Sequence, residues 1–221
     1  MERALIIGNT GGIGSSVQAR LHAQGIAVTG LSRSRDGLDV TDEASIETVF
    51  GRLDGSFDLI FVATGALEIG GVEPEKTLRA VTAQALADQF ALNAAGPMLI
   101  LKHALPLIAR DRLAVFAALS ARVGSIGDNR LGGWHSYRAA KSALNQLMHG
   151  AAIELARTHK QLCVACLHPG TVQTAFTEKY LGRHPSVTAD HAAERLVDVL
   201  SRLTPQYTGG FYDYAMKEIP W

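Results

Sequence analysis

Tyr137 and Lys141 are the side chains of this sequence whose types and spacing are best suited to proton chemistry. They stand four residues apart in a pattern that predicts a helix over Trp134–Thr158, so they share one face of it. A phenol has a pKa near 10, and a nearby ammonium favours the phenolate and lowers that pKa. Such a pair can give a proton to an alkoxide that forms at a carbonyl carbon. A pair without function on the protein surface would have the same spacing. The choice between a catalytic pair and a surface pair therefore depends on the elements that position Tyr137 and Lys141.

Short apolar runs alternate with longer helical patterns along the 221 residues. Strands are predicted at Ala4–Ile7, Ala27–Leu31, Leu59–Ala63, Ala114–Leu119, Leu162–Leu167 and Gly210–Tyr212. Helices are predicted at Ile13–Gln24, Glu43–Leu53, Thr82–Ala109, Trp134–Thr158 and Ala189–Leu203. This alternation predicts one α/β domain over residues 1–221, a Rossmann-type doubly wound parallel sheet of about seven strands with helices on both faces. Ligands of such sheets bind beyond the carboxyl ends of the strands.

A glycine-rich turn follows the first predicted strand. It reads Gly8-Asn9-Thr10-Gly11-Gly12-Ile13-Gly14 and leads directly into a predicted helix. Glycines allow a tight turn in which backbone N–H groups approach a pyrophosphate at the helix N-terminus. The spacing differs from the commoner G-x-G-x-x-G fingerprint, and close helix–sheet packing alone is the rival explanation. The position of the turn favours phosphate binding by Gly8, Thr10, Gly11, Gly12, Ile13 and Gly14.

The second predicted strand ends in Ser32 and Arg33, where such folds hold the adenosine ribose. An acidic residue there would repel a 2′-phosphate, whereas a hydroxyl and a guanidinium suit one, so NADP(H) is favoured over NAD(H). The alternative is that Arg33 is a solvated surface charge. Asp39 can accept a hydrogen bond from the adenine amino group, and Thr41 or Asp42 can cap the next helix.

The composition argues against several classes of function. Lys and Arg (21) balance Asp and Glu (21) without a basic stretch, so no nucleic-acid or acidic-membrane partner is expected. No apolar run approaches the roughly 18 residues of a membrane span or resembles a signal peptide, so a cytoplasmic protein is expected. Cys163 and Cys166 fall on opposite faces of a predicted strand and are interpreted as core thiols, not as a redox pair or metal ligands.

The order of these motifs along the chain is typical of one family. Together the sequence holds Gly8-x-x-x-Gly12-x-Gly14, Asp39, Asn93, Ser120, Tyr137-x-x-x-Lys141 and Pro169-Gly170-x-Val172-x-Thr174. This order resembles the short-chain dehydrogenase/reductase family over essentially the whole chain. The stretch from Leu119 to Asn145 and the tail Gly209-Gly210-Phe211-Tyr212 with Ile219-Pro220-Trp221 are similar to the branch of C-factor and sniffer-type carbonyl reductases.

The resemblance implies a role for each matched residue. Tyr137 would be the acid/base, Lys141 would tune it and hold the nicotinamide ribose, and Asn93 would hold a water that connects Lys141 to solvent. A serine, here Ser120, would steady the substrate oxygen. The remaining cofactor contacts would come from Val40, Ala63, Thr64, Gly65, Pro169, Gly170, Val172 and Thr174. The reaction would transfer a hydride between a nicotinamide and a small carbonyl/alcohol pair, in a homodimer or homotetramer.

Three departures from the family pattern bear on these roles. Ile7 stands where the family often has Thr, and Val62-Ala63-Thr64-Gly65 replaces its Asn-Asn-Ala-Gly run. The family serine lies three residues before a glycine, and counting back from Gly124 gives Ala121. Ser120 is the preferred substitute and Ser125 the alternative. A catalytically weak or inactive dinucleotide-binding regulatory protein is therefore the rival to an enzyme.

The substrate pocket is expected between two late loops, at Arg122–Trp134 and Phe176–Val187. They carry a mixed, mostly apolar set of side chains that suits a small to medium carbonyl compound: Trp134, His135, Phe176, Tyr180 and Leu181. His135 and His184 are interpreted as rim residues, and Phe176–Pro185 as a lid.

Overall fold

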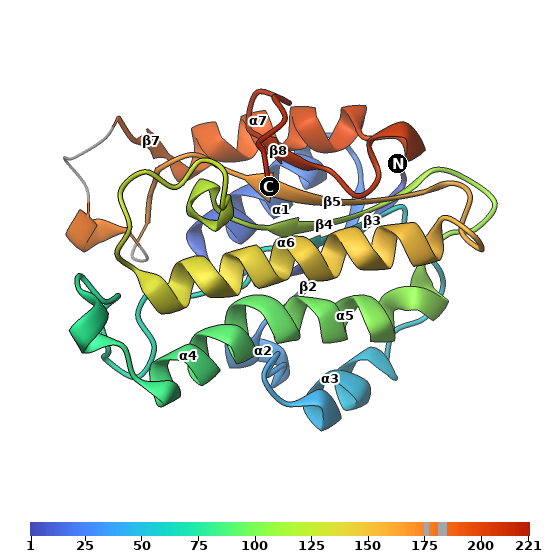
Figure 1. The fold of residues 1–221 in the computed structure, drawn as a ribbon. Helices are drawn as coiled ribbons and strands as arrows, with labels where there is room; N and C mark the ends of the chain where they lie inside the picture. Colours follow the sequence, from blue (N-terminus) through green and yellow to red (C-terminus); the bar gives the residue numbers. More distant parts are fainter. Residues whose placement is uncertain (175–176, 181–184) are drawn as a thin grey trace.

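The computed structural model describes residues 1–174, 177–180 and 185–221. The central sheet has six parallel strands in the order β2-β1-β3-β4-β5-β8 (Figure 1). Their bounds are β1 (Arg3–Ile7), β2 (Ala27–Leu31), β3 (Leu59–Val62), β4 (Ala114–Leu119), β5 (Leu162–His168) and β8 (Phe211–Asp213). A separate parallel pair joins β6 (Val172–Gln173) to β7 (Val187–Thr188). The predicted Rossmann-type fold is confirmed.

Helices cover both faces of the sheet, because successive strand residues point to opposite sides and both sides are apolar. One face packs against α1 (Gly12–Ala23) and α7 (Ala189–Arg202). The other packs against α3 (Glu43–Phe50), α5 (Gly96–Ala104) and α6 (His135–Leu155), with α4 (Ala83–Phe90) alongside α6. Cys163 lies in the first core and Cys166 in the second, both as free buried thiols, as the strand period predicts.

The helix predicted as Thr82–Ala109 is interrupted in the middle. Between α4 and α5 the backbone forms a π-helical segment, Ala91–Ala95, and a 3-10 turn at Leu105–Leu107 ends the run. Pro97 has no N–H for the carbonyl of Asn93 four residues earlier, so the regular α pattern cannot continue through this point. The wide turn fixes Asn93 in a fully buried position.

Short elements account for most other differences from the predicted bounds. A four-residue helix, α2 (Arg33–Asp36), follows β2 at a position where no periodic pattern predicts one. Asp42 caps α3 through Ala44 N–H, so it and not Thr41 takes the capping role. No helix among the described residues is long and apolar enough to cross a membrane.

Candidate active site

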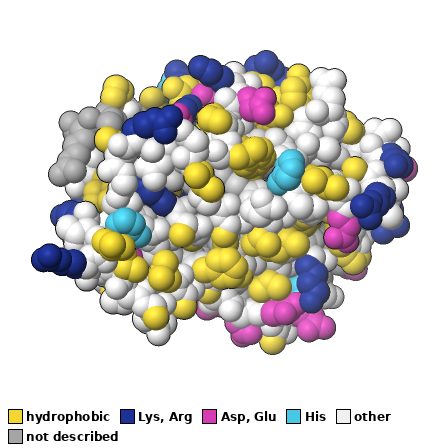
Figure 2. Space-filling view, in the orientation of Figure 1, with side chains coloured by type: hydrophobic (Ala, Val, Ile, Leu, Met, Phe, Trp, Pro, Cys, Tyr) yellow, Lys and Arg dark blue, Asp and Glu magenta, His cyan; other side chains and the backbone are white. Residues whose placement is uncertain are grey.

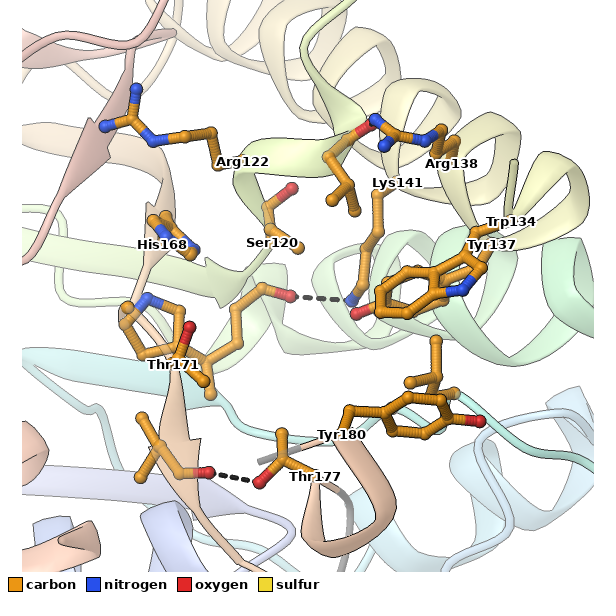
Figure 3. A pocket seen from close by; sticks show the side chains of 18 of the residues that line it. Ser120, Arg122, Trp134, Tyr137, Arg138, Lys141, His168, Thr171, Thr177 and Tyr180 are labelled. Atoms are coloured by element: carbon orange, nitrogen blue, oxygen red, sulfur yellow. Dashed lines mark hydrogen bonds between the residues drawn. The ribbon is translucent and has the colours of Figure 1, made fainter. Parts of the chain in front are cut away.

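The loops after β1, β3, β4 and β5 meet α6 around one cavity of ≈ 1140 Å³ at the carboxyl edge of the sheet. The cavity brings together most of the predicted site. Its lining includes Gly11, Gly12, Ile13, Ala63, Thr64, Gly65, Ser120, Tyr137, Lys141, Pro169, Gly170, Val172 and Thr174 (Figure 3). The predicted residues outside this lining are Gly8, Thr10, Gly14, Ser32, Arg33, Asp39, Val40 and Asn93.

The glycine-rich turn is built for close packing. Gly8 has a φ of +87°, which favours glycine, and a Cβ added to Gly14 would lie 2.3 Å from the Gly8 carbonyl oxygen. A Cβ on Gly12 would lie 2.7 Å from Cγ2 of Thr174. Gly11 precedes α1 without a side-chain cap, so the first N–H groups of a twelve-residue helix point towards the cavity edge without a side-chain acceptor. This geometry fits a pyrophosphate.

The end of β2 carries the groups expected at the adenosine ribose. Ser32 is buried and its hydroxyl lies 3.3 Å from Asp36 Oδ2, which also accepts the Ser32 N–H at 2.7 Å. Arg33 is exposed and makes no ion pair within the described chain. Asp39 accepts hydrogen bonds from the amide and hydroxyl of Thr41, and these bonds hold the pKa of the Asp39 carboxyl below its usual value. The carboxylate is half-buried and lies outside the cavity lining.

Tyr137 and Lys141 both face the cavity from the first turns of α6 (Figure 3). They are almost fully buried, and Lys141 Nζ lies 5.8 Å from the centre of the Tyr137 ring. The ammonium donates a hydrogen bond of 2.9 Å to the carbonyl of Leu119 at the end of β4. Gly124 packs tightly against Lys141, since an added Cβ there would lie 2.8 Å from its carbonyl carbon. The two side chains are therefore positioned by the loop after β4 as well as by their own helix.

The direction of the Tyr137 pKa corrects the sequence-based expectation. Burial raises the pKa of Tyr137, although an adjacent ammonium was expected to lower it. Burial also lowers the pKa of Lys141 to about 8. Desolvation thus favours the neutral form of both side chains. Within the described chain, Tyr137 is thus a protonated hydroxyl suited to donating a proton.

Asn93 lies behind the cavity and fastens the loop after β3. Its Nδ2 donates to the carbonyl of Ala66 (2.9 Å) and to Gln89 Oε1 (2.7 Å), while its Oδ1 accepts the Ala66 N–H. A Cβ on Gly65 would lie 2.8 Å from Asn93 Oδ1 and 3.5 Å from Lys141 Nζ. Asn93 and Lys141 therefore meet across Gly65, and only a glycine leaves room for this approach. The role of Asn93 in holding a water stays a prediction.

The three candidate positions for the substrate-orienting hydroxyl differ in their surroundings. Ala121 lines the cavity at the family serine position but has no polar group. Ser120 also lines it, with its hydroxyl donated to Asn145 Oδ1 at 2.7 Å. Ser125 is buried outside the lining and donates to the carbonyl of Pro220. Because that carbonyl belongs to the C-terminal segment, Ser125 fixes the loop after β4 rather than facing the cavity.

Aromatic rings form one wall of the cavity. Trp134 lies edge-on to Tyr180 with ring centres 5.4 Å apart and to Tyr137 at 6.4 Å. The Tyr180 hydroxyl donates to Glu68 from the loop after β3. His135 is outside the lining. Phe176, Leu181 and His184 lie outside the described residues, as does half of the predicted lid.

The sequence analysis assigned no role to several polar residues of the lining, notably Arg122, Arg138 and His168. The signal for His168 was present, since it stands at the carboxyl end of a predicted buried strand, directly before Pro169. In the described residues, no group of three or more His, Cys, Asp or Glu side chains is arranged to hold a metal ion.

Comparisons with known proteins place this geometry in a family. A family profile described as Enoyl-(Acyl carrier protein) reductase matches residues 7–201. The 1-hydroxy-2-glutathionyl-2-methyl-3-butene dehydrogenase of Rhodococcus sp. (strain AD45) is 30% identical over 230 residues, which cover 96% of each chain. The chain belongs to the short-chain dehydrogenase/reductase family.

Two further matches extend this result. The short-chain dehydrogenase/reductase described here is 31% identical to the C-signal protein of Myxococcus xanthus over 136 residues, which are 62% of this chain and 78% of that one. A crystal structure of NADPH-bound carbonyl reductase from chicken fatty liver superimposes with a TM-score of 0.84 at 23% identity, covering 100% of this chain and 94% of the other. At that identity the superposition shows that the fold is shared.

Proposed function

We propose that this protein is an NADP(H)-dependent oxidoreductase that interconverts an aldehyde or ketone and its alcohol. The observation that carries the proposal is the meeting of Tyr137 and Lys141 with the glycine turn, Gly11 and Gly12, around one cavity. Membership in an oxidoreductase family supports it. The Rhodococcus relative is named as the dehydrogenase of a hydroxy compound, which is the same class of reaction.

The preference for NADP(H) rests on the end of β2. Ser32 and Arg33 stand where an acidic side chain would select against a 2′-phosphate, and Arg33 has no carboxylate partner in the part of the chain that the structure describes. Asp36 turns its carboxylate back onto the Ser32 amide, which leaves the guanidinium as the outward charge. The NADPH-bound carbonyl reductase of the same fold supports this choice.

The chain's own residues suit the proton half of the reaction. When bound, the reduced cofactor supplies a hydride to the carbonyl carbon. Tyr137, held protonated by burial, gives its proton to the oxygen that becomes the alcohol. Lys141, whose ammonium donates to the Leu119 carbonyl, would hold the nicotinamide ribose. Trp134 and Tyr180 would exclude water from this side of the cavity. The backbone of Pro169 to Thr174 would lie along the nicotinamide, on the evidence of its place in the lining.

NADPH oxidation measured against a panel of aldehydes, ketones and quinones tests the proposal. We expect turnover with at least one carbonyl class, and Tyr137→Phe to lower kcat/KM by about 10²–10⁴-fold while NADPH still binds. Fluorescence titration of NADPH gives the binding control. The proposal fails if the parent protein binds NADPH but oxidises it with no acceptor and Tyr137→Phe changes nothing.

A second candidate is a regulatory protein that binds the dinucleotide with little or no turnover. The observation that favours it is the cavity position of Ala121, where the family serine is missing, together with the engaged hydroxyl of Ser120. The similarity to C-signal is consistent with such a role. The same panel separates the two, because only the enzyme shows an acceptor-dependent rate.

A homodimer or homotetramer in the cytoplasm stays part of the proposal. Apolar side chains gather on the face that carries α4, α5 and α6 (Figure 2). Leu86 and Phe90 of α4 and Ile153 of α6 are exposed on their helices. Burial of such side chains between copies of the chain would favour association. Sedimentation velocity over a range of concentrations measures the state.

A further inference from the structure

A ketone oxygen that takes up negative charge needs hydrogen-bond donors aimed at it, and Tyr137 is one. The hydroxyls nearest in sequence to the missing serine are engaged elsewhere. Ser120 donates to Asn145, Ser125 donates to Pro220, and Ala121 offers only a methyl group to the cavity. A second donor therefore has to come from another strand end.

His168 stands at the matching point of the neighbouring strand. β4 and β5 pair in register up to Leu119 and Leu167, so the next residues, Ser120 and His168, lie side by side at the carboxyl edge of the sheet. His168 lines the same cavity, and Figure 3 shows its ring beside Ser120, across the cavity from Tyr137 and Trp134. Neither the glycine turn nor the lysine–tyrosine pair uses it.

The imidazole has unused hydrogen-bonding capacity. Its Nδ1 is buried and has no hydrogen-bond partner in the described part of the chain. His168 is half-buried as a residue and lines the cavity in which a substrate would lie. A neutral imidazole carries one N–H donor. Because Nδ1 is buried, Nε2 is the ring nitrogen that a ligand in the cavity can reach, and with the proton on Nε2 the ring can donate to a substrate oxygen.

The surroundings keep this ring neutral. Burial and the nearby Arg122 guanidinium lower the pKa of His168 to about 4, while Asp213 acts in the opposite direction. Arg122 is itself paired with Asp128 at 2.9 Å and with Asp213 at 3.3 Å, and Asp213 accepts the backbone N–H groups of residues 215 and 217. The charged groups are thus satisfied among themselves and leave the imidazole available.

We propose that the cavity-facing N–H of His168 donates a hydrogen bond to the substrate oxygen, beside the Tyr137 hydroxyl, and replaces the family serine in this chain. The hydride goes to the carbonyl carbon, the proton on the new alcohol comes from Tyr137, and His168 keeps its own proton throughout. This inference rests on the proposed carbonyl/alcohol chemistry. In this arrangement the substrate oxygen accepts hydrogen bonds from two donors, Tyr137 and His168, on opposite walls of the cavity.

The test is a double-mutant cycle between His168→Leu and Ala121→Ser, measured as kcat/KM with the best carbonyl of the panel. We expect His168→Leu to lower kcat/KM by about 30- to 1000-fold, the range for loss of one such donor, with the dissociation constant of NADPH within twofold. Ala121→Ser, which restores the missing hydroxyl, should recover about tenfold in the His168→Leu background and change the parent less than threefold. His22→Leu, an exposed histidine on α1, is the matched control and should have parent activity.

Other results overturn the inference. Parent-like kcat/KM in His168→Leu, or an equal effect of Ala121→Ser in both backgrounds, shows that His168 does not hold the oxygen. If His168→Leu does not fold by circular dichroism, His168→Gln takes its place, and its amide N–H should keep activity within about tenfold of the parent; a larger loss with intact NADPH binding contradicts a donor role. A parent protein without any turnover refutes the proposed function instead, so the two failures are distinguishable.

Discussion

The hydroxyl of Ser120 donates a 2.7 Å hydrogen bond to the side-chain oxygen of Asn145, and both residues are buried. This bond joins the end of β4 to α6 directly beneath the cavity. It gives Ser120 a structural partner at the position where sequence reasoning expected a substrate contact. The consequence is measurable, because stability and activity should respond differently when the bond is removed.

Ser120→Ala leaves the buried Asn145 oxygen without its donor. We expect the free energy of unfolding to fall by about 1–3 kcal/mol and kcat/KM to fall less than about fivefold. Urea denaturation and initial rates measure the two quantities. A loss of 100-fold or more in kcat/KM at unchanged stability would instead identify Ser120 as the substrate-orienting hydroxyl.

Lys141→Met separates activity from stability. The folded-state pKa of Lys141, about 8, lies below the ordinary 10.5, so the unfolded chain binds this proton more tightly than the folded one. This difference lowers the free energy of unfolding by an amount on the order of 3 kcal/mol, and the loss is fully present below pH 8. The free energy of unfolding recovers this amount as the pH rises from about 8 to 10.5. We expect Lys141→Met to be inactive, at least as stable as the parent at pH 7, and to lack the parent's rise in stability over this window. Denaturation at pH 7, 8, 9 and 10 checks it; equal pH dependence in both proteins would contradict it.

Arg33→Glu tests the cofactor preference. Loss of a charged contact to the 2′-phosphate, with repulsion in its place, should raise the dissociation constant of NADPH by about 10- to 100-fold and leave that of NADH within threefold. Arg157→Glu, an exposed charge reversal beyond α6, is the matched control. Parallel titrations with both nucleotides decide, and an equal effect on NADPH and NADH would assign Arg33 to the solvated surface.

Gly14→Ala tests the phosphate cradle by its packing. The new methyl would lie 2.3 Å from the Gly8 carbonyl oxygen, which forces the turn to move. We expect the free energy of unfolding to fall by about 1–3 kcal/mol and NADPH binding to weaken at least tenfold. Gly150→Ala, in the middle of α6 with open space around the new methyl, should raise stability by about 0.5–1 kcal/mol. Tight NADPH binding by Gly14→Ala would show that the turn does not hold the pyrophosphate.

Much of the fold was predictable because buried parallel strands have an unmistakable composition. The strands predicted from apolar runs agree with β1, β2 and β4 to within one residue. The four-residue helix α2 was missed because one turn has no period to detect. The break at Asn93 was missed because its cause is a single missing N–H at Pro97, which a hydrophobic pattern does not record.

Site chemistry was less predictable than site position. The cavity does hold Tyr137, Lys141 and residues of the Pro169–Thr174 segment, since the strand order brings the loop after β5 to the same edge of the sheet as the start of α6. The Lys141 ammonium was expected from the sequence to lower the pKa of Tyr137, whereas burial raises it. Depth of burial is a property of the assembled packing, which a local sequence pattern does not record. The hydrogen-bond partner of Ser120, Asn145, and the charged neighbours of His168 likewise come from other segments of the sequence.

The last residues of the chain belong to the frame of the substrate pocket. Pro220 accepts the Ser125 hydroxyl, Trp221 accepts the Gly127 N–H, and the Trp221 ring stacks on Phe211. These contacts anchor the loop after β4, whereas the glycine-rich turn lies at the start of α1. Displacement of the Trp221 ring would therefore loosen the loop after β4, which lines the cavity, without a direct effect on the glycine-rich turn.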